Sequence, residues 1–207
     1  MKDRVFVPAE GFDNGSLWRA VLERWLSLLE EYEKAESACP DLAYWYGERP
    51  LTGLLGVAAW MVKGWSLEEF GAERQSRFGK KRQGRGDLWI GRSCAKAIVE
   101  AKICWVNQKD VDKASDHVNM GLRKSRSQLR KLVLAGDDGQ PVSVCYVVPH
   151  YSGPSGKASG EYALAELEEW ARRRMMATAK HLATTKDIGE SGSLYPGVLL
   201  MARHEKW

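Results

Sequence analysis

The sequence lacks the cysteine pairs that mark disulfide frameworks and zinc sites. Its four cysteines, Cys39, Cys94, Cys104 and Cys145, are widely spaced, and none belongs to a C-x-x-C pair. The first twenty residues carry charges and contain no long apolar core, which is not typical of a secretory signal. We therefore expect reduced thiols and a cytoplasmic protein.

Long hydrophobic runs and several short catalytic motifs are also missing. The most apolar stretch, Leu51 to Val62, is too short to cross a bilayer, so we expect no membrane partner. The sequence contains no internal repeat, P-loop, G-x-S-x-G, H-E-x-x-H or zinc-ligand spacing. These absences argue against nucleotide hydrolysis by a P-loop, serine hydrolysis and zinc peptidase chemistry.

The composition is typical of a folded protein, with 44% hydrophobic and 28% charged residues in 207 positions. A chain of this length can bury a substantial core, and we expect a single domain over residues 1–207. The net charge of +4 is modest and does not by itself indicate nucleic acid.

The basic residues are nevertheless clustered in two segments. Residues 74–85 contain six basic residues and no acidic one, and a second group occupies residues 123–131. Clustered cations fit the phosphate backbone of nucleic acid, although a solvated loop and a solvated helix face remain equally open interpretations. The candidate nucleic-acid-binding residues are Lys80, Lys81, Arg82, Arg85, Arg123 and Lys124.

Between these clusters, two short segments rich in β-branched and aromatic residues indicate a β-hairpin, at 85–90 and 100–105. A four-residue loop, 92–95, would pair Gly91 with Lys96 and Ile90 with Ala97. That register places Asp87 opposite Glu100. Because side chains alternate along a strand, Lys102 then shares a face with both carboxylates.

Two facing carboxylates repel each other and destabilise a strand pair unless a cation lies between them. Mg²⁺ is suited to this position, because it is held by one or two carboxylates with water and phosphate completing its shell. Lys102 could balance charge, orient a water or stabilise a phosphoryl-transfer transition state. The alternative is an exposed hairpin whose Asp, Glu and Lys form surface ion pairs.

An Asp followed after a gap by Glu-x-Lys on a hairpin resembles the PD-(D/E)XK nuclease superfamily, with Gly86 in place of the motif's proline. The resemblance implies a restriction-endonuclease-like fold and a metal-dependent nuclease, with DNA the favoured substrate. It assigns Mg²⁺ or Mn²⁺ to Asp87, Glu100 and the Ala101 carbonyl, and help for the attacking water to Lys102. Such nucleases act in restriction, repair, recombination and anti-phage defence. An early helix often supplies another acidic residue, and Glu31 is the weak candidate here.

A second hypothesis keeps the same scaffold without catalysis, as a module that binds nucleic acid or a partner protein. The retained Asp87, Glu100 and Lys102 argue against it, because a module that does not cut has no need for facing carboxylates. A second copy of the chain or another protein is left open as a further partner.

The order of predicted elements gives an α/β fold with a mixed central sheet flanked by helices. The nuclease-like core covers about 16–148, followed by a C-terminal helix and strand in 161–203. We expect a short edge strand at Val5–Val7, helices at 16–36, 51–63, 109–134 and 161–182, and strands at 72–78, 86–91, 100–105, 142–148 and 198–202. In this scheme Glu73 lies near Arg92, several residues from Asp87.

Overall fold

The fold was obtained as a computed structural model, which describes residues 4–12, 15–35, 41–75, 79–107, 112–133, 139–152, 156–183 and 193–206. Cys39, Arg77, Phe78 and the start of the predicted 109–134 helix lie outside these residues. The helices are α1 (Gly15–Ala35), η1 (Ala43–Tyr46), α2 (Glu48–Met61), α3 (Ala114–Leu129) and α4 (Gly156–Arg172). The strands are β1 (Val5–Phe6), β2 (Trp65–Gln75), β3 (Lys81–Arg92), β4 (Ala95–Asn107), β5 (Leu132–Val133), β6 (Gln140–Ser152), β7 (Ala177–Leu182), β8 (Ser193–Leu194) and β9 (Gly197–His204).

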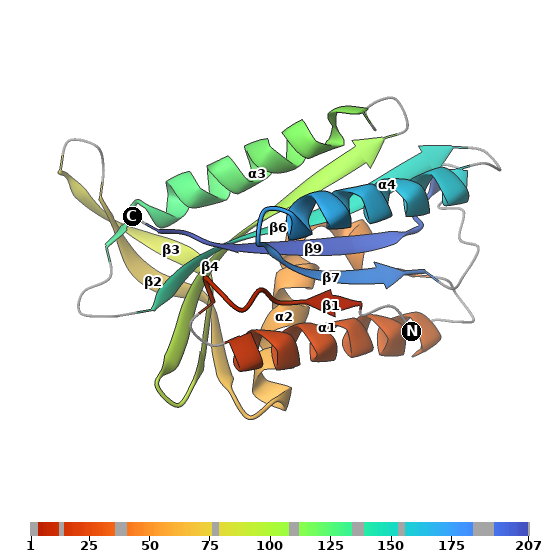
Figure 1. The fold of residues 1–207 in the computed structure, drawn as a ribbon. Helices are drawn as coiled ribbons and strands as arrows, with labels where there is room; N and C mark the ends of the chain where they lie inside the picture. The colour runs from red at the N-terminus through yellow and green to blue at the C-terminus, as the bar shows by residue number, and fades with distance from the viewer. Residues whose placement is uncertain are drawn as a thin grey trace.

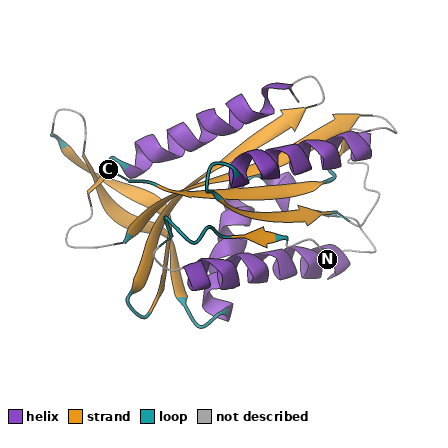
Figure 2. Cartoon of the chain, viewed as in Figure 1, coloured by secondary structure: helices purple, strands orange, loops and turns teal. Residues whose placement is uncertain are grey.

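A mixed sheet forms the centre of the molecule, with strand order β1-β7-β9-β6-β4-β3-β2-β5 and β8 paired to β6. β4 and β6 run parallel, and the other pairs are antiparallel. Helices cover both faces (Figures 1 and 2), which is the predicted α/β arrangement of a mixed sheet flanked by helices. In the part of the chain that the structure describes, no helix is long and apolar enough to span a membrane.

Each face of the sheet has its own hydrophobic core. On one face α1 and α2 pack over the central strands, with Leu22 and Trp25 of α1 fully buried. On the other face α3 and α4 contribute Val118, Leu122 and Leu164. Full burial of each such side chain stabilises the fold by about 1.5–3 kcal/mol. The predicted apolar stripes of α1 and α3 therefore form, with Leu132 of the α3 stripe lying in β5 instead.

The hairpin of β3 and β4 has the predicted register, with Gly91 opposite Lys96 and Ile90 opposite Ala97. Arg92 also pairs with Ala95, so the connecting turn is shorter than expected. The first strand of the meander differs more. It runs Trp65–Gln75 rather than 72–78, and Glu73 lies opposite Gln83, not near Arg92. The prediction failed because the pairing of residues 65–70 with β3 was not expected. Within this segment Glu68 lies opposite Leu88 and Phe70 opposite Gly86, while Glu69, with a positive φ of 44°, has no partner in the register.

The C-terminal region corrects two further expectations. The predicted helix 161–182 is α4 followed by strand β7, and Met175, expected inside, has a positive φ of 55° at the turn between them. β6 continues through His150 to Ser152, which were expected in a loop. Both segments gain sheet partners, β9 for β7 and β8 for the end of β6, and sheet pairing overrides local helix or loop preference.

Candidate active site

The two strands of the central hairpin separate beyond the pair Leu88–Val99. Past that point, side chains contact backbone groups that a neighbouring strand would otherwise pair. The Ala101 N–H donates to Asp87 Oδ2 at 2.8 Å, and the Ile103 N–H donates to a glutamate of α2 at 3.0 Å. Buried backbone N–H groups must be hydrogen-bonded. These carboxylates accept hydrogen bonds from N–H groups that have no strand partner where the two strands separate. The opening between β3 and β4 is thus lined with acidic groups.

Glu100 is fully buried at this opening, in the register position that follows Val99. Its Oε1 lies 3.1 Å from Nη2 of Arg74, while its Oε2 has no hydrogen-bond partner among the described residues. Burial, and next the negative charge of Asp87, raise the pKa of Glu100 to about 8. A buried carboxylate oxygen without a donor, beside a second carboxylate, is a place where a cation would be stabilised.

Lys102 lies on the same side of β4 and contacts the acidic groups around the opening. Its Nζ is 3.2 Å from Glu48 Oε1 and 3.8 Å from Asp87 Oδ2, and it donates a hydrogen bond to the Ala101 carbonyl. The structure thus brings together Asp87, Glu100 and Lys102. The Ala101 carbonyl, for which we expected a role in metal binding, accepts this hydrogen bond from Lys102.

Glu48 is the residue of this cluster that the sequence interpretation missed. It lies in the first turn of α2, where its Oε2 accepts the Ile103 N–H. The helix was expected to begin after Pro50, which left Glu48 in a loop. Glu48 lies two residues before Pro50, and both residue types are favoured in the first turn of a helix. This pattern could have indicated that the helix includes Glu48, since carboxylates favour the positive end of the helix dipole.

Glu31, the acidic residue proposed from the early helix, does not join the cluster. Its carboxylate pairs with Arg24 of the same helix, with Oε1 2.7 Å from Nη1. The helix that supplies an acid to the opening is α2, which directly precedes the meander, rather than α1.

Helix α3 closes the opposite side of the site. The buried Ser125 hydroxyl donates to the Glu100 carbonyl at 2.6 Å. A Cβ at Gly121 would lie 3.2 Å from the Cys145 sulfur and 3.9 Å from Cβ of Lys102. α3 continues through Gly121, and the glycine lets the helix approach the sheet.

The predicted nucleic-acid-binding residues lie on two exposed elements, the β2–β3 arm and α3. On the arm, Lys81 pairs with Glu73 at 2.9 Å and Arg85 with Glu69 at 2.6 Å. Partial neutralisation by these acids reduces the positive potential that the sequence alone suggested. The remaining candidates are Lys80 and Arg82 on the arm, and Arg123 and Lys124 on α3, all exposed.

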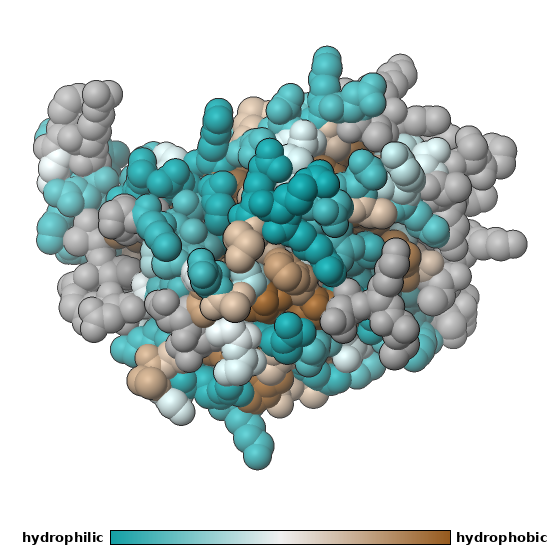
Figure 3. Space-filling model, viewed as in Figure 1, coloured by the Kyte–Doolittle hydropathy of each residue, from teal (hydrophilic) through white to brown (hydrophobic). Residues whose placement is uncertain are grey.

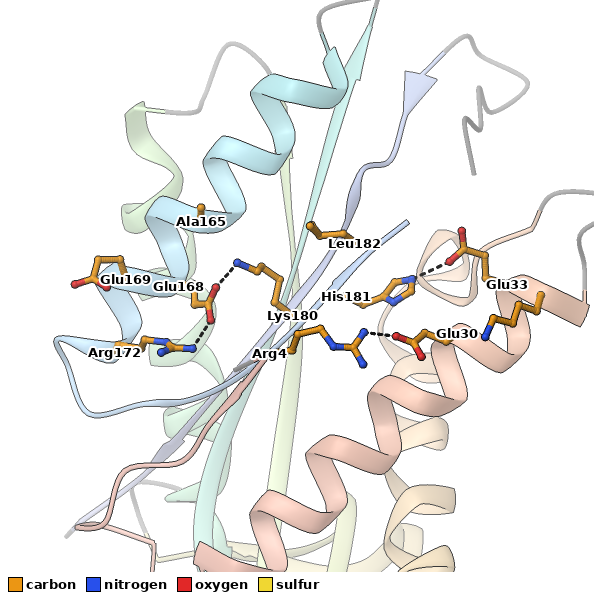
Figure 4. Close-up of a pocket in the computed structure, with 11 residues that line it drawn as sticks. Arg4, Glu30, Glu33, Ala165, Glu168, Glu169, Arg172, Lys180, His181 and Leu182 are labelled. Atoms are coloured by element: carbon orange, nitrogen blue, oxygen red, sulfur yellow. Dashed lines mark hydrogen bonds and ion pairs between the residues drawn. The ribbon is translucent and has the colours of Figure 1, made fainter. Parts of the chain in front are cut away.

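A large cavity of about 980 Å³ lies at the other end of the sheet, between α1, α4 and β7 (Figure 4). Its charges are paired with one another: Arg4 with Glu30, and Glu168 with both Arg172 and Lys180. This pairing leaves the cavity without a strong preference for one sign of ligand charge. The side of the molecule shown in Figure 3 is mainly hydrophilic, with apolar surface gathered near its centre.

The cavity also contains a buried pair of titratable residues. His181 Nε2 lies 3.2 Å from Glu33 Oε2, and burial lowers the pKa of His181 even though Glu33 opposes that shift. β7 belongs to the far end of the strand order from β3, so this pair is separate from the Asp87–Lys102 cluster.

Fold and site together define an α/β protein with acidic residues and one lysine at the point where two central strands separate. Comparison of the chain with protein-family models, with curated proteins and with solved structures gave no match. Within the described residues, no group of three or more His, Cys, Asp or Glu side chains is arranged to hold a metal ion.

Proposed function

We propose that the protein is a Mg²⁺- or Mn²⁺-dependent nuclease of restriction-endonuclease-like architecture. The observation that carries the proposal is the position of Asp87, Glu100 and Lys102 around one opening between β3 and β4. Carboxylates turned into the gap between these strands could hold a divalent ion for phosphodiester hydrolysis. Arg74 and Lys102 offset part of the repulsion between the two acids, and a bound divalent cation would offset it further.

The order of elements supports the architectural part of the proposal. A helix, three antiparallel strands, a helix and a strand occur in the order α2, β2, β3, β4, α3 and β6, with the two-residue strand β5 between α3 and β6. β6 returns parallel to β4, so α3 is the crossover between them. This order agrees with the helix–three strands–helix–strand core that the sequence resemblance implies.

The donor chemistry fits a hard divalent ion. Asp87 and Glu100 would hold it, and the unpartnered Oε2 of Glu100 is the oxygen left for coordination. Glu48 is a third carboxylate within reach of the same lysine. When bound, such an ion polarises a phosphoryl oxygen and lowers the pKa of a coordinated water.

The chain's own residues would supply positioning and charge. Lys102, held by Glu48 and the Ala101 carbonyl, would orient the attacking water and stabilise negative charge at the phosphate. The hydrogen bond from Ala101 N–H would fix the Asp87 carboxylate in the gap. Ser125 would hold β4 in place through the Glu100 carbonyl.

Nucleic acid, with DNA favoured, is the proposed substrate, and restriction, repair and anti-phage defence are the roles we consider. The exposed cations of the β2–β3 arm and of α3 support phosphate binding. A cytoplasmic location belongs to the same proposal. A second copy of the chain or a partner protein as a further partner stays a prediction.

The competing function is a binding module on the same scaffold. The ion pair between Arg74 and Glu100 favours the binding module, because a cation of the protein itself already neutralises one of the two carboxylates. A module of this kind would bind nucleic acid with or without metal and would cut none.

One experiment separates the two functions. Wild-type, Asp87→Asn and Lys102→Ala proteins are incubated with plasmid, linear and single-stranded DNA in Mg²⁺, Mn²⁺ or EDTA. A nuclease should cut only with metal, and each variant should lose about 10²-fold or more of that activity while still folding and binding DNA. A wild-type protein that neither cuts any of these substrates nor gains thermal stability from either metal would favour the binding module.

A further inference from the structure

Four aromatic rings form a cluster at the C-terminal ends of β4 and β6. We call Trp45, Trp105, His150 and Tyr195 the aromatic cluster. Tyr195 contacts the other three rings, with centroids 5.5 Å from Trp45 and 6.2 Å from both Trp105 and His150. Trp105 also meets His150 edge to face at 6.2 Å. Rings from separate parts of the chain therefore hold one another in a fixed arrangement.

The aromatic cluster adjoins the candidate active site through two short segments. Trp105 follows Lys102 by three positions in β4, a distance of about 10 Å along an extended strand. Trp45 precedes Glu48 by three positions, and Glu48 binds both Lys102 and the Ile103 N–H. Because side chains alternate along a strand, Trp105 lies on the face of β4 opposite Lys102, the face packed by α2, so the cluster adjoins the site through Glu48.

Trp105 is the member of the cluster that faces outward, with 38% of its surface exposed. An indole left in water loses the stabilisation that burial would give. Here the exposed ring is supported from behind by His150 and Tyr195, so little side-chain entropy is lost when a ligand covers it. A rigid exposed aromatic ring beside a phosphodiester site suits the flat face of a nucleobase.

We infer that Trp105 and its supporting rings bind an unpaired nucleobase next to the phosphate to be cut. The inference rests on the proposed function and specifies its substrate as single-stranded nucleic acid or a duplex with unpaired bases. Bases inside an intact duplex are already stacked and paired, so they cannot cover Trp105 without being released from the helix. Stacking on Trp105 therefore discriminates by strandedness rather than by sequence.

The test measures binding in EDTA, where no metal-dependent cleavage interferes. Fluorescence anisotropy of labelled oligothymidine and of a labelled duplex is compared for wild type, Trp105→Ala and Trp105→Phe. Loss of one stacked base should weaken oligothymidine binding about 5- to 100-fold in Trp105→Ala and much less in Trp105→Phe. Duplex affinity should change by less than about 2-fold, because phosphate contacts dominate it.

Trp60 provides the matched control. It is 59% exposed, more than Trp105, and its indole N–H donates to the Ser66 carbonyl. It lies near the end of α2 remote from Glu48, about 18 Å along the helix. Trp60→Ala should leave both affinities unchanged, and circular dichroism and melting temperature establish that each variant is folded.

The outcomes are distinguishable from those of the nuclease test. The inference is overturned if the wild type does not bind oligothymidine, if Trp105→Phe loses as much affinity as Trp105→Ala, or if single-strand and duplex binding fall equally. If Trp105→Ala selectively loses oligothymidine affinity but the wild type cuts no substrate, the stacking site is supported and the nuclease function is rejected. If the wild type cuts with metal but Trp105→Ala binds oligothymidine as the wild type does, the nuclease function is supported and the stacking site is rejected.

Discussion

Arg74 of β2 forms an ion pair with Glu100 of β4, with Nη2 3.1 Å from Oε1, although β3 lies between these strands. The guanidinium also donates to the Arg85 carbonyl, which lies beyond the paired part of the β3–β4 hairpin. A Cβ at Gly84 would approach Cγ and Cδ of Arg74 to 2.7 Å, so glycine at this position leaves room for the arginine. Arg74 therefore supplies the cation that partly neutralises the metal-free site.

Replacing Arg74 by Ala should destabilise the protein when no metal is present. Removal leaves the buried Glu100 without its ionic partner, and we expect the free energy of unfolding in EDTA to fall by about 1–3 kcal/mol above pH 8, where Glu100 is ionised. Arg82→Ala is the control, because Arg82 lies directly opposite Arg74 on β3 and is exposed. It should change stability by less than about 0.5 kcal/mol in urea denaturation. Equal effects of the two changes would contradict the assigned role.

The raised pKa of Glu100 predicts a pH dependence of stability in EDTA. The folded-state pKa is about 8 and the ordinary value is 4.5, so between these values the folded protein keeps a proton that the unfolded chain has lost. The contribution of Glu100 to stability is therefore fully present below pH 4.5 and is lost as pH rises toward 8, by at most about 1.4 kcal/mol per unit. Urea denaturation of wild type and Glu100→Gln across this range tests it. A constant difference between the two proteins would show that Glu100 does not titrate as stated.

Glu48→Gln should reduce metal-dependent cleavage by about 10-fold or more, because the amide no longer supports the charge of Lys102. Glu31→Gln is the matched control, since Glu31 pairs with Arg24 on α1. Its cleavage rate should equal that of wild type. Rates on single-stranded and plasmid DNA at saturating Mn²⁺ provide the measurement, and a Glu48→Gln rate equal to that of Glu31→Gln would exclude Glu48 from the site.

Charge reversal at Lys80, Lys81 and Arg82 should weaken DNA binding and flatten its dependence on salt. Each lost phosphate contact lowers the slope of log K against log salt by about 0.9 on duplex DNA. Lys81 should contribute less than Arg82, because it already pairs with Glu73. Arg173→Glu, an exposed cation directly after α4, is the control. A salt slope unchanged from wild type would assign the arm to ordinary solvated surface.

Local sequence patterns were sufficient for the central hairpin and for much of the core. Local patterns predicted the register as far as Leu88–Val99, although the pairing ends before Asp87 and Glu100. Alternation predicted the shared face with Lys102, because strand side chains follow a strict period of two. Periodicity likewise predicted α1, since an apolar stripe such as Leu17, Val21 and Trp25 is stable when it is buried against the core of the protein. The fold class followed from the order of these elements.

Sequence alone determined which acids and which lysine belong to one face of the hairpin. Tertiary structure decided the rest, because it depends on contacts between segments far apart in the chain. Glu48 joins the site since α2 begins against β4, and Arg74 joins it since β2 begins at Trp65 and carries the arginine past Gly84. The segment 177–182 has helix-compatible periodicity, yet it becomes β7 because β9 offers it a ladder of backbone hydrogen bonds. The residues of one segment do not show which distant segment will pair with it, so the alternation that predicted the hairpin could not predict these contacts.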